Sequence, residues 1–313
     1  MSTDTTLQGA LPRVVLITRK TPLELLLERH GTLSQERFYL RARGEDPARY
    51  ERGHEVQQAA LAAVTQALPP DQRRTRIDRE LLPRFLFAAD DLVVVVGQDG
   101  LVANVAKYLD GQLTIGINPD PATFDGVLCR HPPSAMPRLL AWTRDPDTTC
   151  RVQERTMAHA AREDGQRLLA LNELFVGHQT HQSARYRIEL AKVGNGGGER
   201  QSSSGLICST GTGATGWGRS IAQQRHLEKR LPGPEDARLV WFVREPFPSV
   251  ATGTELSFGQ LVPGERLVLW SEMQQGGTVF ADGIEEDRLE FASGHRLELS
   301  IAERRLRLVV PSP

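Results

Sequence analysis

The apolar segment Leu92–Val96 constrains the fold of this chain more than any other part of its sequence. All of its residues are apolar, so a strand formed there has to be covered on both faces, as strands of parallel sheets are. A glycine-bounded turn at 97–100, a helical pattern that reaches Leu109 and a second strand pattern at 113–117 follow at once. Strand, turn, helix and strand in so short a span predict a βαβ unit with a right-handed crossover, in a sheet covered on both sides.

The residues before this unit carry the same alternation of strand and helix signals. Val14–Ile17 is rich in β-branched residues, and the sequence Thr-Pro-Leu-Glu at 21–24 has the spacing of a capping box at the start of a helix. A second helical periodicity runs from Val56 to Leu68 and stops at two prolines. The first part of the chain is therefore predicted to be an α/β domain.

Beyond about residue 145 the pattern changes to short runs of alternating polarity separated by turn signals, which is typical of antiparallel strands. Asp164-Gly165 marks one expected hairpin and the glycine-rich sequence at 194–198 a looser one. The segment 151–162 is assigned as a strand because Asp-Gly follows it, although its alanines are also compatible with a helix. The other expected strands are 186–190, 239–243, 267–270 and 297–310. The second part is therefore predicted to be β-rich.

The composition excludes several classes of protein. The 313 residues include 38 Lys and Arg against 39 Asp and Glu, a net charge of −1, which argues against a protein that coats nucleic acid or an anionic membrane. No uncharged apolar run approaches the ~20 residues that a membrane helix needs, and the first residues lack the features of a signal peptide. The three cysteines form no CxxC pair, which excludes a disulfide framework and a four-thiolate zinc site. We therefore expect a cytoplasmic protein with reduced, mostly buried thiols.

The turn at 97–100 is the first candidate site. Gly97, Gln98, Asp99 and Gly100 follow a buried strand and open a helix, an arrangement that points backbone N–H groups at a ligand, usually a phosphate. A carboxylate beside a phosphate is repelled unless a metal or a proton transfer compensates, so Asp99 is a candidate for such chemistry. The alternative is that Asp99 only shapes the turn or caps the helix. Because the chain has no Walker lysine and no GxGxxG fingerprint, a nucleotide would be held differently from one in a P-loop or Rossmann protein.

A second candidate site is the pair Asn172 and Glu173, which interrupts the otherwise apolar stretch 169–176. A buried polar group left unpaired costs about 1–3 kcal/mol, so a partner such as a pair of ribose hydroxyls is expected. An edge position open to water is the alternative. His178 and His181, just beyond, have weak metal-like spacing but no third ligand, and we expect them to be solvated.

A third candidate site is the segment 209–217, which is rich in hydroxyls and glycines and follows an expected strand at 205–208. Its glycines permit close backbone approach, its hydroxyls can form hydrogen bonds, and Trp217 at its end offers a stacking face. Such a density of small polar residues after a strand favours a ligand site over an ordinary loop.

Taken together, these clusters resemble the NAD kinase family, whose hallmarks are a Gly-Gly-Asp-Gly-Thr turn after a strand, an Asn-Glu pair and, further on, a Thr-Gly-rich segment. Their order and approximate spacing agree. The likeness is closer to the mitochondrial type of NAD kinase, through several blocks between Val93 and Glu245 and a late Asp282-Gly283. The blocks are Ile117-Asn118-Pro119-Asp120-Pro121, Gly126–Cys129, Ala170–Gly177, Ser203–Leu206, Thr210–Gly213 with Trp217, and Val243–Pro246.

The resemblance implies an α/β N-terminal domain with a phosphofructokinase-like parallel sheet, a β-rich C-terminal domain, and a dinucleotide bound between them. It also implies roles for single residues, with Asp99 as the catalytic general base. The residues implied to bind nucleotide and phosphate are Gly97, Gln98, Gly100 and Asn118. The residues implied to bind NAD are Asn172, Glu173, Thr210, Gly211, Thr212, Gly213, Trp217 and Asp282. No residue is assigned to a metal bound by the protein itself.

The leading hypothesis is transfer of the γ-phosphoryl group of ATP to the 2′-hydroxyl of the adenosine ribose of NAD(H), giving NADP(H), with Mg²⁺ on the donor phosphates. Inorganic polyphosphate is left open as the donor. Two departures from the family turn, Gln98 for the second glycine and Leu101 for the threonine, fall where the donor phosphates approach. They support a second hypothesis, a dinucleotide-binding sensor without turnover. A lipid or diacylglycerol-type kinase is the third, but the exposed apolar groove or basic face that it needs is not visible in the sequence.

The expected domains are residues 1–145 and 146–313, and a return of the last ~20 residues to the N-terminal domain is left open. The expected partners are small-molecule nucleotides and a second copy of the chain in a homodimer. Nucleic acid and membranes are not expected as partners.

Overall fold

The computed structural model describes residues 12–191 and 198–312. The chain forms two compact units, which are described separately. Unit 1 comprises the described residues up to Val152 and those from Arg307 onward, and unit 2 comprises Gln153–Leu306. Two long strands, β5 (Cys150–Arg162) and β16 (Arg296–Pro311), each begin in one unit and end in the other.

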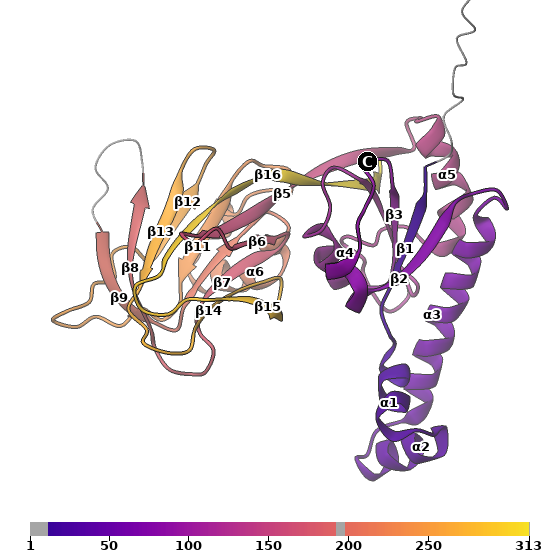
Figure 1. Ribbon diagram of the computed structural model, residues 1–313, viewed down its shortest axis with the longest axis horizontal. Helices are drawn as coiled ribbons and strands as arrows, with labels where there is room; N and C mark the ends of the chain where they lie inside the picture. Colours follow the sequence, from indigo (N-terminus) through magenta and orange to yellow (C-terminus); the bar gives the residue numbers. More distant parts are fainter. Residues whose placement is uncertain (1–11, 192–197, 313) are drawn as a thin grey trace, which may run out of the picture. The chain divides into compact units, whose positions relative to one another are not determined.

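Unit 1 is built around a parallel sheet with the strand order β2-β1-β3-β4-β16 (Figure 1). All residues of β1 and β3 are buried, as the apolar character of both strands requires. The parallel register places Ile17 opposite Val95, so the carboxyl ends of these two strands lie level with each other. The bounds of the first four strands are Val14–Thr18 for β1, Arg74–Asp78 for β2, Leu92–Val96 for β3 and Leu113–Ile117 for β4.

The helices of unit 1 begin at recognisable caps. In the predicted capping box, Thr21 Oγ1 accepts from the N–H of Glu24 at 3.3 Å, and the Glu24 carboxylate accepts from the N–H of Thr21 at 2.7 Å. Helices α3 and α5 pack their apolar residues, among them Val64 and Leu139, into one core with β1 and β3. The helices are α1 (Pro22–His30), α2 (Leu33–Ala42), α3 (Pro47–Ala67), α4 (Asp99–Ala106) and α5 (Met136–Arg144), with 3₁₀ turns at η1 (Arg79–Arg84) and η2 (Pro133–Ala135).

Unit 2 consists of two antiparallel sheets. One has the strand order β12-β11-β10-β7-β14-β15, and the other combines β8, β9 and β13 with β5, β6 and the first part of β16. Their bounds are β6 (Arg167–Ala170), β7 (Glu173–His178), β8 (Ala184–Ala191), β9 (Gly198–Ser203), β10 (Leu206–Ser209), β11 (Leu239–Val243), β12 (Phe258–Leu261), β13 (Arg266–Ser271), β14 (Gly277–Ala281) and β15 (Ile284–Glu290).

The main core of unit 2 is shared by the two sheets. Leu174 and Trp241 reach it from the six-stranded sheet, and Tyr186 and Leu269 reach it from the other. The outer face of the six-stranded sheet is covered by α6 (Trp217–Gln224), which packs Ile221 among buried aromatic side chains. Short 3₁₀ turns, η3 (Gly213–Thr215) and η4 (Glu228–Arg230), flank α6.

Most of the predicted elements are confirmed, including the parallel strands of the first part and the antiparallel strands of the second. The segment 151–162 is a strand, and Asp164-Gly165 turns it back, with the Arg162 N–H donating to Gln166 O at 2.9 Å. The residues 194–197 of the second expected hairpin lie outside the described residues. The strands beside them, β8 and β9, pair antiparallel.

Several predicted details are wrong. The helix expected from Val56 begins at Pro47, because Asp46 caps it by accepting from the Ala48 N–H at 3.0 Å. The turn after β3 is shorter than expected, since α4 already begins at Asp99. Asn172 and Glu173 do not interrupt a single strand, because β6 ends at Ala170 and β7 begins at Glu173. Strand β2 and helix α2 were not predicted, since neither carries a continuous apolar run.

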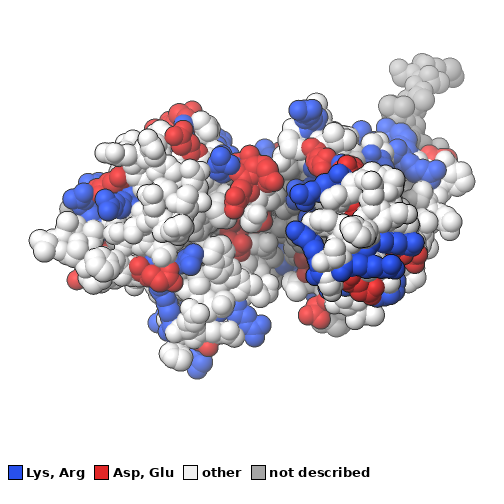
Figure 2. Space-filling model, turned by 90° about the horizontal axis from the view of Figure 1, so that it is seen from below, with Lys and Arg blue, Asp and Glu red and all other residues white. Residues whose placement is uncertain are grey.

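The distribution of charged side chains and the state of the cysteines match what the composition indicated. Figure 2 shows basic and acidic side chains interspersed over the face in view. Cys129, Cys150 and Cys208 are all free thiols and all buried, as predicted. Among the described residues, no helix combines the length and the apolar character needed to cross a membrane.

Candidate functional site

Unit 1 brings polar residues from four strands to one edge of its sheet. Strands β1 to β4 run in the same direction, so their carboxyl ends share that edge. Arg19 follows β1, Arg79 follows β2, Gly97 follows β3 and Asn118 follows β4. Ligands of open α/β sheets bind at this edge, which therefore contains the candidate phosphate site of unit 1.

The turn after β3 leads directly into α4. Gln98 is the N-cap residue, but its side chain is exposed and makes no capping hydrogen bond. Leu101 is buried and packs against Gly97, where a Cβ would lie 3.1 Å from Leu101 Cδ2. A Cβ on Gly100 would meet nothing within 4 Å. The two departures from the family turn therefore differ, because Gln98 faces solvent at the helix start whereas Leu101 belongs to the core.

The carboxylate of Asp99 is held by three backbone N–H groups of the segment after β4. Oδ2 accepts from Val127 at 2.8 Å, and Oδ1 accepts from Leu128 and from Cys129 at 2.8 Å each. A carboxylate offers about four lone-pair positions, so Asp99 keeps one acceptor position, on Oδ2. Burial and then the charge of Asp99 raise the pKa of the Cys129 thiol, which keeps that thiol protonated. Asp99 thus acts as a clamp on the segment 127–129, a role that the sequence does not reveal.

Asn118 shapes the same loop. Its Nδ2 donates to Phe124 O at 2.8 Å, and its Oδ1 accepts from the Asp120 N–H at 3.0 Å. Gly126 has a φ of +67°, and a Cβ there would lie 2.3 Å from Cys129 O, so this turn needs glycine. Asn118 is buried, and its amide is engaged in shaping the loop rather than directed to a phosphate.

Cationic residues at this edge were missed by the sequence analysis. Lys20 forms ion pairs with Glu28 at 2.8 Å and Glu80 at 3.4 Å, so its charge is largely balanced. Arg79 donates to the side chain of Asn104 at 3.4 Å, whereas Arg19 is exposed. The signal that would have found Arg19 and Lys20 is their position directly after the predicted strand at 14–17, because basic residues at a carboxyl edge suit anionic ligands. Arg79 had no such signal, since it follows β2, which was not predicted.

In unit 2 the predicted NAD-binding residues gather at one end of the six-stranded sheet. Strand β7 begins at Glu173, beside the end of β10 at Ser209 and the end of β14 at Ala281. The antiparallel pairing therefore brings together the Asn-Glu pair, the hydroxyl-rich segment after β10 and the Asp282-Gly283 turn after β14. These three stretches are far apart in the sequence.

The carboxylate of Asp282 accepts hydrogen bonds from the backbone of the Asn-Glu pair. Its Oδ2 accepts from the Leu171 N–H at 3.0 Å, and its Oδ1 accepts from the N–H groups of Asn172 at 2.7 Å and Glu173 at 3.3 Å. The Asp282 N–H in turn donates to Glu173 O at 3.0 Å. Asp282 and Gly283 both have positive φ, as a two-residue type I′ hairpin requires. The carboxylate of Asp282 is thus directed at protein backbone, although the sequence assigned it to the ligand.

The segment 210–213 is locked against the same pair. Thr210 Oγ1 donates to Leu171 O at 2.5 Å and accepts from the N–H groups of Thr212 and Gly213 at 3.0 and 3.2 Å. A Cβ on Gly213 would lie 2.2 Å from Asn172 O, and one on Gly211 would lie 1.8 Å from Gly233 O. The glycines are therefore required by packing within the protein, and the hydroxyl of Thr210 is fully used.

A buried arginine forms a hydrogen bond with the side chain of Thr212. Arg155 is only 3% exposed, donates through Nη1 to Thr212 Oγ1 at 3.2 Å and donates through Nε to Gln153 at 3.0 Å. Gln153 in turn donates to the carboxylate of Glu235 at 3.3 Å. Because Thr212 Oγ1 accepts from Arg155, its own proton is directed elsewhere. Sequence analysis missed Arg155, since an arginine in a β-strand gives no local signal of burial.

Glu173 differs from the two engaged aspartates. Its carboxylate has no hydrogen bond or ion pair within residues 12–191 and 198–312. Burial, and then the negative charge of Asp282, raise its pKa to about 7. The half-buried Glu173 therefore changes charge near neutral pH, and it is free to meet a hydroxyl-bearing ligand.

Trp217 forms part of an aromatic stack on the same sheet. Its ring lies nearly parallel to that of Phe175, with 10° between the planes and 6.1 Å between the centroids, and Phe175 stacks on Phe280 at 4.7 Å. The Arg244 guanidinium lies over the Trp217 ring at 5.3 Å. Trp217 remains 36% exposed, which leaves a surface on which a planar group can stack.

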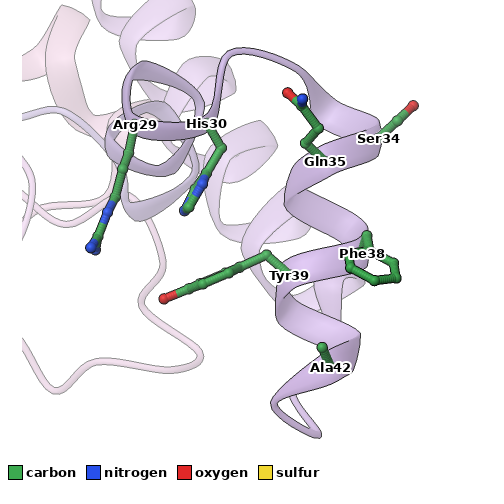
Figure 3. Close-up of a pocket in the computed structure, with 7 residues that line it drawn as sticks. All are labelled: Arg29, His30, Ser34, Gln35, Phe38, Tyr39 and Ala42. Atoms are coloured by element: carbon green, nitrogen blue, oxygen red, sulfur yellow. The ribbon is translucent and has the colours of Figure 1, made fainter.

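Two features lie apart from these clusters. A hollow of about 610 Å³ lies between α1 and α2, and Figure 3 shows Arg29, His30 and Tyr39 extending into the same space. None of the predicted site residues lines this hollow. The part of the chain that the structure describes has no group of three His, Cys, Asp or Glu side chains placed to hold a metal ion.

The comparisons with known proteins place the fold. The chain is similar to the crystal structure of yeast NADH kinase complexed with NADH, with a TM-score of 0.61 and 13% identity over 97% of this chain and 84% of the other. It is also similar to an NAD kinase from Archaeoglobus fulgidus in complex with ATP, with a TM-score of 0.56 and 16% identity over 95% and 92% of the two chains. No protein-family model and no curated protein sequence matches the chain. At these identities the likeness establishes the fold, which is that of the NAD kinases.

Proposed function

We propose that this chain is an NAD kinase, which transfers the γ-phosphoryl group of ATP to the 2′-hydroxyl of the adenosine ribose of NAD(H). One observation carries the proposal: nearly the whole chain has the fold of two kinases, one complexed with NADH and the other with ATP. The gathering of Asp99, of the Asn172-Glu173 pair and of the segment 210–213 at the ends of their sheets supports it.

Unit 1 is assigned to the phosphate donor. The carboxyl edge of its sheet offers the backbone of the turn at Gly97, the start of α4, and the exposed side chains of Gln98 and Arg19. Fixed N–H donors and a cation at this edge would neutralise the charge that spreads over the transferred phosphoryl group. Gly100 leaves open space in which a phosphate can approach the backbone.

Asp99 is assigned to the acceptor hydroxyl, as an orienting group. Three of its four lone-pair positions are used by N–H groups, and only Oδ2 can still accept the hydroxyl proton in a hydrogen bond. The loose transition state of phosphoryl transfer makes little demand on a strong base, since bond formation to the nucleophile is slight. Orientation of the hydroxyl is therefore the larger part of what Asp99 contributes.

Unit 2 is assigned to the dinucleotide. Glu173 and the side chain of Asn172 would form hydrogen bonds with ribose hydroxyls, and the exposed part of Trp217 would stack on a planar ring. Thr210, Gly211 and Gly213 have structural contacts that fix this surface. We therefore assign ligand contact to Asn172, Glu173 and Trp217 before the other members of the predicted set.

Magnesium enters the proposal as part of the donor substrate, MgATP. The described residues offer no group of three His, Cys, Asp or Glu side chains for a resident ion, and three N–H groups already donate to the carboxylate of Asp99. The ion would supply charge neutralisation on the donor phosphates. Inorganic polyphosphate as an alternative donor, the preference between NAD and NADH, the mitochondrial subtype, the cytoplasmic location and the homodimer stay predictions.

A second candidate function, a dinucleotide-binding sensor, is favoured by two specific observations. Gln98 stands at the helix start where the family has glycine, and the carboxylate of Asp99 is engaged with the segment 127–129. A sensor would retain the unit 2 cluster and bind NAD(H) without turnover.

One assay separates the two functions. Purified protein is incubated with ATP, Mg²⁺ and NAD or NADH, and NADP(H) formation is followed by a dehydrogenase specific for the phosphorylated dinucleotide. Reactions without donor, and with polyphosphate in place of ATP, identify the donor. Dinucleotide binding measured by calorimetry without any NADP(H) formation would select the sensor, and absence of both binding and turnover would refute both functions.

A further inference from the structure

Asp282 has two effects on the site that follow from its contacts. Its carboxylate accepts from three successive N–H groups, those of residues 171–173, and so fixes the backbone that carries Asn172 and Glu173. The same negative charge lies beside the carboxylate of Glu173 and acts on it. The backbone position of Asn172 and Glu173 and the ionisation of Glu173 thus both depend on Asp282, which lies in a hairpin distant in the sequence.

We infer that Asp282 is a positioning residue, which fixes the backbone of the Asn172-Glu173 segment and places a second negative charge next to Glu173, and thereby makes dinucleotide binding by unit 2 depend on pH. The inference rests on the proposed function for the identity of the ligand. It differs from the assignment made on the sequence, in which Asp282 itself contacts NAD.

Asp282 is the charged residue that acts on the carboxylate of Glu173. Strand β10, on one side, contributes Ser209 opposite Glu173 and the buried thiol of Cys208. Strand β14, on the other side, has no titratable residue, and Asp282 follows it. On β7 itself the next titratable group is His178, at the far end of the strand, where its ring accepts from the Thr180 N–H at 3.1 Å.

Two more elements packed against β7 carry charged residues. Helix α6 carries Arg219, which is exposed, and β8 carries Arg185, Arg187 and Glu189. Arg187 and Glu189 form an ion pair with each other at 3.4 Å, so their charges offset each other. Arg185 is exposed to solvent, which screens its charge.

The direction of the pH effect follows from hydrogen bonding. Ionised Glu173 accepts from two ribose hydroxyls, whereas the protonated acid loses an acceptor position. Because burial and Asp282 raise the pKa of Glu173 to about 7, affinity for NAD should rise with pH up to about 7 and level off above it. Without the charge of Asp282, Glu173 ionises at lower pH and the midpoint of this rise moves to lower pH.

The substitution Asp282→Asn tests the inference without destroying the hairpin. Asn-Gly is among the best sequences for a type I′ turn, so the fold of β14 and β15 is retained. The asparagine side chain keeps one acceptor oxygen and loses the negative charge. Its NH₂ group then lies opposite one of the backbone N–H groups, so one hydrogen bond is lost. Glu286→Gln is the matched control, because it removes the same charge from an exposed position on β15 of the same hairpin.

The first measurement needs no ligand. Protein labelled with ¹³C in the glutamate carboxyl groups is titrated by NMR, and the Glu173 signal is assigned by its loss in Glu173→Gln. We expect the titration midpoint of Glu173 to fall by roughly one pH unit or more in Asp282→Asn, the usual effect of removing a nearby like charge, and to stay unchanged in Glu286→Gln. An unchanged midpoint in Asp282→Asn would overturn the inference, whether or not the protein binds NAD.

The second measurement is the NAD dissociation constant as a function of pH, by calorimetry. In Asp282→Asn we expect the midpoint to move to lower pH and the affinity above neutral pH to fall roughly tenfold, because one positioning bond is lost. Glu173→Gln should remove the pH dependence. If Asp282 contacted NAD directly, its substitution would lower affinity equally at every pH, which would refute the inference. Failure of the wild type to bind NAD at any pH would refute the proposed function and the ligand part of the inference together.

Discussion

Asp99→Asn separates the two roles that the structure gives to this side chain. In the wild type, three N–H groups of residues 127–129 donate to the carboxylate at 2.8 Å each. The asparagine oxygen can keep two of these bonds, but its NH₂ group then faces the N–H of Val127, and neither can accept. Hydrogen bonds to a charged group contribute about 1.5–3 kcal/mol and neutral ones about 0.5–1.5 kcal/mol. With a discount for partial exposure, the loss of one bond and the weakening of two should lower the free energy of unfolding of unit 1 by about 2–4 kcal/mol.

The control for this substitution is Asp125→Asn. Asp125 lies in the same loop and is exposed, and its carboxylate accepts no hydrogen bond in the described part of the chain, so the same charge is removed without touching the clamp. Thermal unfolding should show a Tm lower by roughly 5–10 °C for Asp99→Asn and little change for Asp125→Asn. Amide exchange at residues 127–129 should accelerate in Asp99→Asn alone.

Turnover is measured well below the lower of the two Tm values, so that both variants are folded. Because the amide can no longer accept and orient the 2′-hydroxyl, NADP formation by Asp99→Asn should fall on the order of 10²-fold or more, with NAD affinity nearly unchanged. A variant as stable as the wild type would refute the clamp. A variant that keeps more than about a tenth of the wild-type rate would refute the role of Asp99 at the hydroxyl.

Further predictions concern four other positions. Gly100→Ala should raise Tm slightly, since alanine favours the helix by up to about 1 kcal/mol and its Cβ meets no atom within 4 Å, yet it should raise the KM for ATP if phosphate approaches there. Gln98→Gly should raise the KM for ATP a few-fold in steady-state kinetics and leave kcat unchanged, because an exposed donor is lost; a roughly tenfold rise in kcat would favour the sensor. Arg155→Met should weaken NAD binding in calorimetry and lower the free energy of unfolding by about 2–5 kcal/mol, because buried partners lose their donor. Relative to Glu173→Gln, the wild type should lose stability in denaturant unfolding as pH rises from about 4.5 to about 7, because the native state holds the proton of Glu173 that the unfolded state has released.

The elements that sequence analysis located are those whose burial shows in a short stretch. Leu92–Val96 is apolar on both faces and is fully buried in the sheet, and the capping box at 21–24 begins a helix as its spacing requires. Strand β2 escaped prediction because its Arg-Thr-Arg alternation is that of an edge strand with one side exposed. The start of α3 was placed too late, since its first two turns are mostly polar and contain no buried residue.

The residues of the candidate site were found more readily than their roles. Asp99 was selected because it follows a buried strand, Asn172 because it interrupts an apolar stretch, and Asp282 through the family resemblance. None of these reasons depends on what the side chains contact. The partners of Asp99 are 28 to 30 residues away in the sequence, and those of Asp282 are 109 to 111 residues away. These partners are backbone N–H groups, which every residue except proline carries, so no sequence pattern identifies them.

The three carboxylates of the candidate site differ in how many of their acceptor positions are already used by the protein. Asp99 and Asp282 each accept from three backbone N–H groups, so both carboxylates are engaged with donors of the protein and fix the loops that carry the site. Glu173 accepts from no described group, and burial beside Asp282 keeps it near the point of ionisation at neutral pH. A hydroxyl-bearing ligand suits the carboxylate of Glu173, because its hydroxyl groups supply the hydrogen-bond donors that the carboxylate lacks and bring no further charge into the buried site. Of the three carboxylates, Glu173 is therefore the one whose ionisation should change on dinucleotide binding, with release of a proton below about pH 7 that calorimetry in buffers of different ionisation enthalpy would detect.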